Sequence, residues 1–267
     1  MAVLTISREI EVEGTEIGRS VAETLGYEYW SGAKILERLD ARGDQWKKWA
    51  ESLDNHCPTV WERYDWSFKS FAALLQSALL DCAAQGRAVL VGKGGNFLLG
   101  DVPFCLRVHL VGSPRWLARA VMRQEGTDEK TAAWLVEKKD RERSCFLHSL
   151  YGRNWEDPKE YDRVFNPEIQ PMGEILSTVL DLLKEREKLQ TKEAMETLRL
   201  RARAARARAR ILTDPRMLLP TLEIALEGDG LVLRGIVHNP EEHRKLERAA
   251  RELAGEVRLK CDLRYRQ

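Results

Sequence analysis

Short apolar segments alternate with longer amphipathic segments along most of the chain. Apolar residues dominate segments 3–6, 87–92 and 104–111, as in strands that are buried on both faces of a sheet. Elsewhere apolar residues recur every three or four positions, which predicts helices. These helices span 15–25, 67–84, 114–124, 128–148 and 172–183. With a further short strand at 161–165, the alternation predicts an α/β fold with a mainly parallel sheet.

The pattern changes in the last third of the chain. Segment 184–211 contains almost no helix-breaking residue and carries many charges, so we expect a helical connector. Residues 212–267 then show two alternating strands joined by a Gly-Asp-Gly turn, a helix and a last alternating strand. The helix has Asn239 at its cap, Pro240 in its first turn and Gly255 at its end. This order predicts a small α+β unit of ββαβ type.

Composition narrows the class of protein. Hydrophobic residues make up 43% of the chain and charged residues 32%, which is typical of a globular protein with solvated helices. No apolar segment is long enough to span a membrane, and the N-terminus lacks the pattern of a secretory signal. The five cysteines are widely spaced without a Cys-x-x-Cys pair, so we expect reduced thiols rather than disulfides or zinc ligands. These features predict a cytoplasmic protein.

The turn after the first strand has the position of a phosphate-binding P-loop but not its composition. A P-loop has the form G-x-x-x-x-G-K-S/T, in which backbone N–H groups surround the phosphates and the hydroxyl ligates magnesium. Here the turn reads SREIEVEGTEIG. It keeps Gly14 and offers Thr15 as a magnesium ligand, but it lacks the lysine, and Glu11 and Glu13 add negative charge. The motif alone does not identify a nucleotide site.

Several blocks of the chain, in their order, resemble the cytidylate kinase-like family, the P-loop group related to bacterial cytidylate kinases. The residues LTISRE and GTEIG stand in register with the family's opening pattern, I-T-I-S-R-E-x-G-S-G-G-x-E-I-G. The block VLVGKGGNFLL resembles its second strand and G-R-G turn, and blocks 109–126 and 138–166 continue the likeness. The resemblance implies a bacterial protein with the fold of a nucleoside monophosphate kinase. If active, it would use ATP and Mg²⁺, with a pyrimidine monophosphate as the acceptor.

The resemblance assigns catalytic roles to four residues. Lys93 takes the position of a basic residue that would face the acceptor monophosphate. Asp140 and Arg143 match the D-x-x-R spacing of the lid, where the arginine would clamp the transferring phosphoryl group and the aspartate would hold the lid. Arg8, beside the loop, would partly replace the missing lysine.

The resemblance also implies a set of nucleotide-binding residues. Thr15 would ligate magnesium as well as contact the nucleotide. Arg119 and Arg123 would lie near the donor nucleotide, although the charge pattern alone favours a solvated helix face. The full set is Ser7, Gly14, Thr15, Arg119 and Arg123.

The loop glutamates oppose the chemistry that the resemblance implies. Phosphoryl transfer depends on positioning and on neutralising charge, and like charges brought close in a partly dry site are unfavourable. We therefore expect a degenerate P-loop with phosphoryl transfer impaired or lost, and the choice between an enzyme and a pseudokinase stays open.

Two tryptophans and a histidine also have candidate roles. Trp30 or Trp61 could stack a base of the acceptor, whereas the position of His109 in an apolar strand indicates a core histidine.

The segment RLRARAARARAR, 199–210, carries six arginines and no acidic residue. Such a segment could bind the phosphates of nucleic acid or anionic lipid. No aromatic residues are interleaved for base stacking, which argues against nucleic acid. We expect its arginines to pair with acidic patches of the kinase-like part.

Residues 212–267 resemble a BON-type domain, with Gly230, Gly235 and Gly255 at matching positions. That resemblance implies binding of a protein or anionic lipid partner rather than catalysis. The alternative function is therefore a non-catalytic sensor or scaffold that acts through this part and the basic helix. The expected domains are a kinase-like P-loop domain, an arginine-rich helical linker and a BON-like domain, at 1–183, 184–211 and 212–267.

Overall fold

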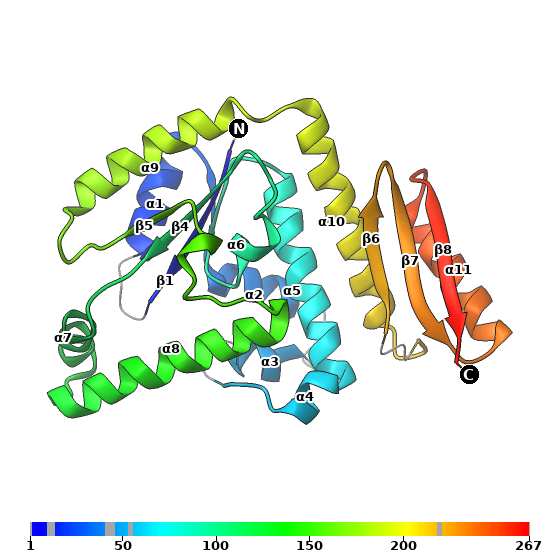
Figure 1. Ribbon diagram of the computed structural model, residues 1–267, viewed down its shortest axis with the longest axis horizontal. Coiled ribbons are helices and arrows are strands. Elements are labelled where there is room, and N and C mark those ends of the chain that lie inside the picture. Colours follow the sequence, from blue (N-terminus) through cyan, green and yellow to red (C-terminus); the bar gives the residue numbers. More distant parts are fainter. Residues whose placement is uncertain (1, 10–13, 41–45, 53–55, 218–220, 267) are drawn as a thin grey trace.

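The structure is a computed structural model in which an α/β body and a smaller α+β module lie on either side of one helix, α10 (Figure 1). It describes residues 2–9, 14–40, 46–52, 56–217 and 221–266. Glu11 and Glu13, on which the prediction of a degenerate P-loop depends, lie outside the described residues.

The described residues form a five-stranded parallel sheet with the order β2-β3-β1-β4-β5. Its strands are β1 (Val3–Arg8), β2 (Glu28–Trp30), β3 (Ala88–Val91), β4 (Cys105–Leu110) and β5 (Arg163–Phe165). The predicted α/β class and parallel sheet are confirmed. Sequence reasoning missed β2, because three residues are too few to show an alternating pattern.

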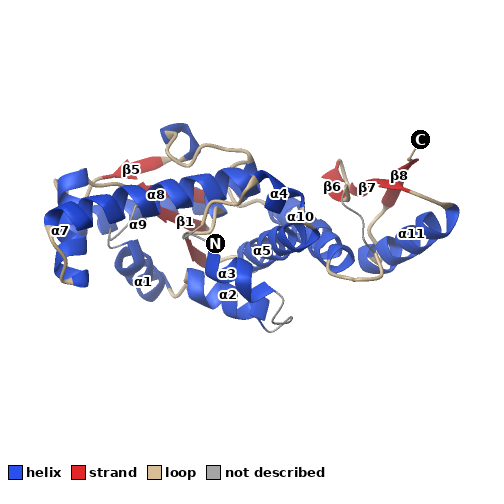
Figure 2. Ribbon diagram, turned by 90° about the horizontal axis from the view of Figure 1, so that it is seen from below, coloured by secondary structure: helices blue, strands red, loops and turns tan. Residues whose placement is uncertain are grey.

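Helices cover both faces of this sheet, as Figure 2 shows from below. Leu4 and Ile6 of β1 pack on the face that holds α1 (Gly14–Leu25) and α9 (Met172–Glu187). Val3 packs on the opposite face, where α5 (Trp66–Ala84) lies. Alternate residues of one strand are thus buried on opposite faces, which explains the unbroken apolar segments of the sequence.

The remaining helices of the α/β body lie around the ends of the strands. They are α2 (Gly32–Asp40), α3 (Lys47–Ser52), α4 (Val60–Tyr64), α6 (Gly95–Leu98), α7 (Pro114–Glu125) and α8 (Glu129–Tyr151), with a 3₁₀ turn at Pro158–Glu160. The Asp128 side chain accepts hydrogen bonds at the start of α8, and Gly152 ends that helix with a φ of 67°. Both ends of this long helix are therefore set by local chemistry.

The second module contains β6 (Glu223–Glu227), β7 (Gly230–Val237), α11 (Pro240–Ala254) and β8 (Leu259–Tyr265). Strands β6 and β7 are antiparallel, and β7 and β8 are parallel. The predicted ββαβ order is confirmed. The likeness to BON-type domains stays a prediction.

The connector is two helices rather than the one helix that was predicted. Helix α9 ends at Glu187, so Lys184 lies within its last turn, and α10 spans Lys192–Leu212. The Thr191 hydroxyl accepts a hydrogen bond from the N–H of Ala194 and so starts the second helix. A change of direction without glycine or proline explains why the pattern did not show it.

Helix α10 packs on both the α/β body and the C-terminal module. The alanines of its arginine-rich segment are mostly buried, and they belong to one apolar cluster that runs from α5 to the second sheet. Arg206 pairs with Asp81 of α5 at 2.7 Å, and Arg203 donates to the carbonyl of Ala254 in α11. Arg201 pairs with Asp101. The prediction that these arginines pair with acidic groups of the kinase-like part is confirmed for Arg201 and Arg206.

One prediction about the cysteines is wrong. Cys57 and Cys145 form a disulfide, with their Cα atoms 5.3 Å apart and a sequence separation of 88. The fold brings α8 against the segment that precedes α4, which linear spacing could not reveal. Cys82 and Cys105 are buried free thiols, as predicted.

An ion-pair cluster centred on Asp162 ties β4 to β5 and α9. Arg107 donates to both carboxylate oxygens of Asp162, at 3.0 and 3.2 Å, and Arg186 contacts the same group at 2.9 Å. Burial alone would raise the pKa of Asp162, but the hydrogen bonds from Arg107 outweigh it, so the net pKa lies below its usual value.

We expect Asp162→Asn to lower the free energy of unfolding at pH 7 by about 2 kcal/mol, because it leaves Arg107 without its counter-charge. Since the folded pKa of Asp162 is the lower one, this contribution is complete above the unfolded value of about 4 and is lost as the pH falls through the folded pKa. Urea unfolding at pH 7 and pH 3 measures it. The control Asp181→Asn, in an exposed pair with Lys184, should change stability by less than about 0.5 kcal/mol. An equal loss at both pH values would contradict the assignment.

We expect reduction of the Cys57–Cys145 disulfide to lower the free energy of unfolding by about 2–4 kcal/mol, because the unfolded chain regains the freedom of a long loop. Urea unfolding with and without dithiothreitol measures this loss, and Cys57→Ser should abolish the response to the reductant. The control Cys261→Ser, which removes a free thiol, should keep it. An unchanged unfolding curve for the native chain would show that the bond does not form.

Candidate functional site

The four predicted catalytic residues come from two strand ends and from the lid helix, α8, at one edge of the main sheet. Arg8 ends β1, and Lys93 follows β3 in a turn between Gly92 and Gly94. Because the carboxyl ends of parallel strands share an edge, these residues lie where ligands bind in open α/β sheets. A Cβ placed on Gly92 would lie 3.0 Å from Nη1 of Arg8, so that guanidinium lies against the turn.

Helix α8 connects both strand ends. Arg143 donates from Nη1 to the backbone carbonyl of Arg8 at 3.0 Å. At the end of the same helix, the Tyr151 hydroxyl donates to the carbonyl of Lys93 at 2.8 Å. Gly94, with a φ of 79°, is required here because a Cβ would meet the Tyr151 ring at 2.2 Å.

Asp140 and Arg143 are in contact, as their spacing on the lid helix suggested. Arg143 Nη1 lies 3.0 Å from the Asp140 carboxylate, and both side chains are mostly buried. The Arg143 guanidinium also lies over the Trp155 ring, 5.6 Å from its centre. With the carbonyl of Arg8, these contacts hold the guanidinium in one position.

Ser7 lies beneath this edge rather than at its surface. Its hydroxyl accepts hydrogen bonds from Nε1 of Trp155, at 2.5 Å, and from the Tyr161 hydroxyl, at 3.4 Å. His109 stacks on Tyr161, and its pKa falls to about 4 because of burial and, to a smaller extent, the charge of Arg143. His109 is therefore a neutral core histidine, as the sequence indicated.

Carboxylates also gather at this edge, which sequence reasoning missed. Glu9 accepts a hydrogen bond from the N–H of Gly112 at 2.8 Å. Its pKa is nevertheless raised, mainly by burial and further by the charges of Asp140 and Glu156. The site is thus a mixture of cations and carboxylates, and added negative charge is already unfavourable at Glu9. Glu9 stood next to Arg8 in the sequence, but nothing in the pattern set it apart.

The other predicted nucleotide-binding residues lie on two helices. Gly14 begins α1, and Thr15 is exposed in its first turn. Arg119 and Arg123 are exposed on α7. Their predicted roles remain predictions.

Of the two tryptophans proposed to stack a base, one is excluded. Trp30 is 2% exposed, and the cationic groups of Lys34 and Arg38 lie over it, 4.0 and 4.1 Å from the ring centre. It is a core residue and has no free ring face. Trp61 on α4 is 85% exposed, so its ring is accessible.

The described residues contain no group of three or more histidine, cysteine, aspartate or glutamate side chains that could hold a metal ion. The role of the Thr15 hydroxyl as a magnesium ligand stays a prediction. A magnesium ion there would take its other ligands from phosphate oxygens and water, as is usual for this ion.

No helix of the described chain has the length and apolar character needed to cross a lipid bilayer.

Solved structures that match the chain include proteins from three organisms. An uncharacterized protein from Eubacterium ventriosum is 18% identical, and the match covers 69% of this chain and 98% of that chain with a TM-score of 0.52. A shikimate kinase from Bacteroides thetaiotaomicron (13% identity, 68% and 98% covered, TM-score 0.45) and a gluconokinase from Sinorhizobium meliloti (18%, 70% and 94%, 0.41) are more distant. Only the first match has a TM-score above 0.5, and at 18% identity it shows a likeness of fold alone. No protein with a curated description matches the chain.

A family model of the cytidylate kinase-like family matches residues 3–169. The matched segment contains the whole five-stranded sheet, the glycine turn around Lys93 and the lid helix. It covers more than half of the chain, which therefore belongs to the cytidylate kinase-like family.

Proposed function

We propose that the protein binds a nucleoside triphosphate, with ATP as the expected ligand, at the carboxyl edge of the main sheet. The observation that carries the proposal is the hydrogen bond from Arg143 to the carbonyl of Arg8, which brings the lid helix onto the end of β1. Lys93 lies in the turn against which the Arg8 guanidinium packs. Family membership supports this assignment, because nucleotide binding is the common property of kinase-like P-loop proteins.

The residues at this edge fit a polyphosphate. Arg8, Lys93 and Arg143 supply cations from three different elements, and phosphate oxygens pair with such groups through charge-assisted hydrogen bonds. Magnesium, when bound, would neutralise charge on the phosphates, and Thr15 would help to hold it. Lys93 would face the pyrimidine monophosphate of the acceptor.

We further propose that phosphoryl transfer is impaired or lost. Arg143 is paired with Asp140 at 3.0 Å, so it can clamp a transferring phosphoryl group only by sharing or leaving that partner. Glu9 and Glu156 add negative charge beside the same guanidinium. Together with the missing P-loop lysine, these groups oppose the charge neutralisation on which the transfer depends.

A second candidate function is a non-catalytic sensor or scaffold that acts through the C-terminal module. The observation that favours it is the apolar cluster shared by α5, α10 and the second sheet, which joins the module to the kinase-like body. When the module binds a partner, whether a protein or an anionic lipid surface, α10 would transmit the effect of that binding to the α/β body.

Calorimetric titration with ATP and with CMP, each with and without Mg²⁺, tests the first proposal. We expect magnesium-dependent binding of ATP that weakens about tenfold or more in Arg143→Met, because one charge-assisted contact is lost. The matched control is Arg141→Met, two residues away on the same helix, whose side chain is 70% exposed. A coupled assay for ADP release should then show little or no turnover.

The outcomes separate the candidates. No binding of any nucleotide at millimolar concentration would reject the nucleotide site and leave the sensor or scaffold. Equal weakening in Arg143→Met and Arg141→Met would show that general charge, not the lid arginine, attracts the ligand. Rapid ADP release in the presence of CMP would reject the impairment and establish an active kinase.

A further inference from the structure

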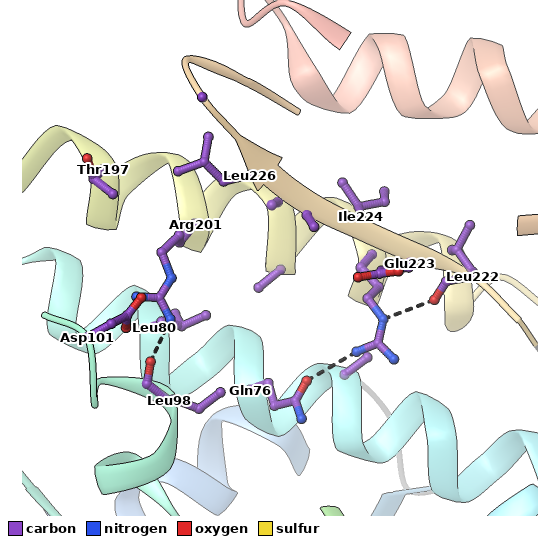
Figure 3. Close-up of a pocket in the computed structure, with 16 residues that line it drawn as sticks. Gln76, Leu80, Leu98, Asp101, Thr197, Arg201, Leu222, Glu223, Ile224 and Leu226 are labelled. Carbon is purple, nitrogen blue, oxygen red and sulfur yellow. Dashed lines mark hydrogen bonds and ion pairs between the residues drawn. The ribbon is translucent and has the colours of Figure 1, made fainter. Parts of the chain in front are cut away.

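A groove of about 740 Å³ lies between the α/β body and the C-terminal module (Figure 3). Helices α5 and α10 form two of its sides, strand β6 forms a third, and residues 98–101 close one end. Small-molecule sites in proteins commonly have this size and are frequent where two domains meet. The groove shares no residue with the Arg8, Lys93 and Arg143 cluster.

Most of the groove is apolar. Leu80 and Leu98 of the α/β body lie on one side, and Ile224 and Leu226 of β6 lie on the other (Figure 3). Alanines of α10 complete the wall between them. Such a surface would stabilise the apolar body of a ligand by removing it from water.

Arg208 gives the groove a cation without an acidic partner. Its Nε donates to the carbonyl of Leu222 at 3.2 Å, and its Nη1 donates to the side-chain oxygen of Gln76 at 3.1 Å. Both partners are neutral. Among the described residues no carboxylate lies within ion-pair distance of Arg208. Burial lowers the pKa of Arg208. The charge of nearby Glu223 raises that pKa, but by less than burial lowers it.

Two other arginines of α10 have acidic partners in the α/β body. Arg201 lines the same groove and is paired with Asp101, and Arg206 is paired with Asp81. A buried charge without a counter-charge is unfavourable, and an anion that enters the site relieves this. A guanidinium has five N–H donors, and two protein contacts leave several of those of Arg208 available.

We propose that this groove binds a small organic anion with an apolar body. Its acidic group pairs with Arg208, and its apolar part lies between Leu80 and Leu98 on one side and Leu226 on the other. Because the groove is built from both modules, the bound anion holds the module on the α/β body. This site is independent of the proposed nucleotide site.

Two fluorescent dyes of nearly the same shape test the proposal on the full chain. 8-Anilinonaphthalene-1-sulfonate carries an anionic group, and N-phenyl-1-naphthylamine is the same ring system without it. We expect the native chain to bind the sulfonate at least tenfold more tightly than the neutral dye. Arg208→Met should abolish this difference by weakening the sulfonate alone. The matched control Arg210→Met, on the exposed side of α10, should leave both affinities unchanged.

Further measurements keep the test decisive if Arg208→Met does not fold. Ala205→Trp fills the groove without replacing the arginine, and it should weaken both dyes. A saturating concentration of ATP with Mg²⁺ should leave the binding of the sulfonate unchanged. Equal affinity of the native chain for the two dyes, unchanged binding in Ala205→Trp, or displacement by ATP would each overturn the proposal.

Discussion

The burial of α10 on two sides is the constraint on which the two-part architecture depends. Its alanines have side chains small enough for α5 to approach from one side and the second sheet from the other, so a single apolar cluster includes both. Alanine also has the highest helix propensity, which keeps a segment with so many charges helical. Larger residues at Ala204 or Ala207 would force the two parts to separate, because neither is exposed.

The arginines of α10 extend what the alanines begin. Several of these long side chains carry their charge beyond the buried face. Arg206 reaches Asp81 of the body, and Arg203 reaches the carbonyl of Ala254 in the module. Such pairs fix the angle at which the module sits more than they stabilise it, since exposed pairs contribute little free energy. Arg208 is the exception, because it is mostly buried between neutral acceptors. The same arrangement that joins the modules therefore creates a cation that a ligand can satisfy.

Most helices and strands could be predicted from the sequence, because the patterns that mark them are local. Periodicity located the long helices and the buried strands, and caps such as Asn239 fixed helix ends. What it could not reveal is set by contacts between distant residues. Cys57 meets Cys145 across 88 residues, and Trp155 reaches Ser7 across 148. In the site, the family resemblance singled out Arg8, Lys93 and Arg143, whereas the carboxylates near Arg143 come together only when α8 docks.

If phosphoryl transfer is lost, as we propose, the lid arginine would still serve the fold. Arg143 holds Asp140, lies over Trp155 and donates to the backbone of β1, so it fastens α8 to the sheet. In an active kinase the same guanidinium would have to be available to a transferring phosphoryl group. A chain that uses Arg143 to hold its lid can therefore keep the family's fold and its phosphate-binding edge while the catalytic step is lost.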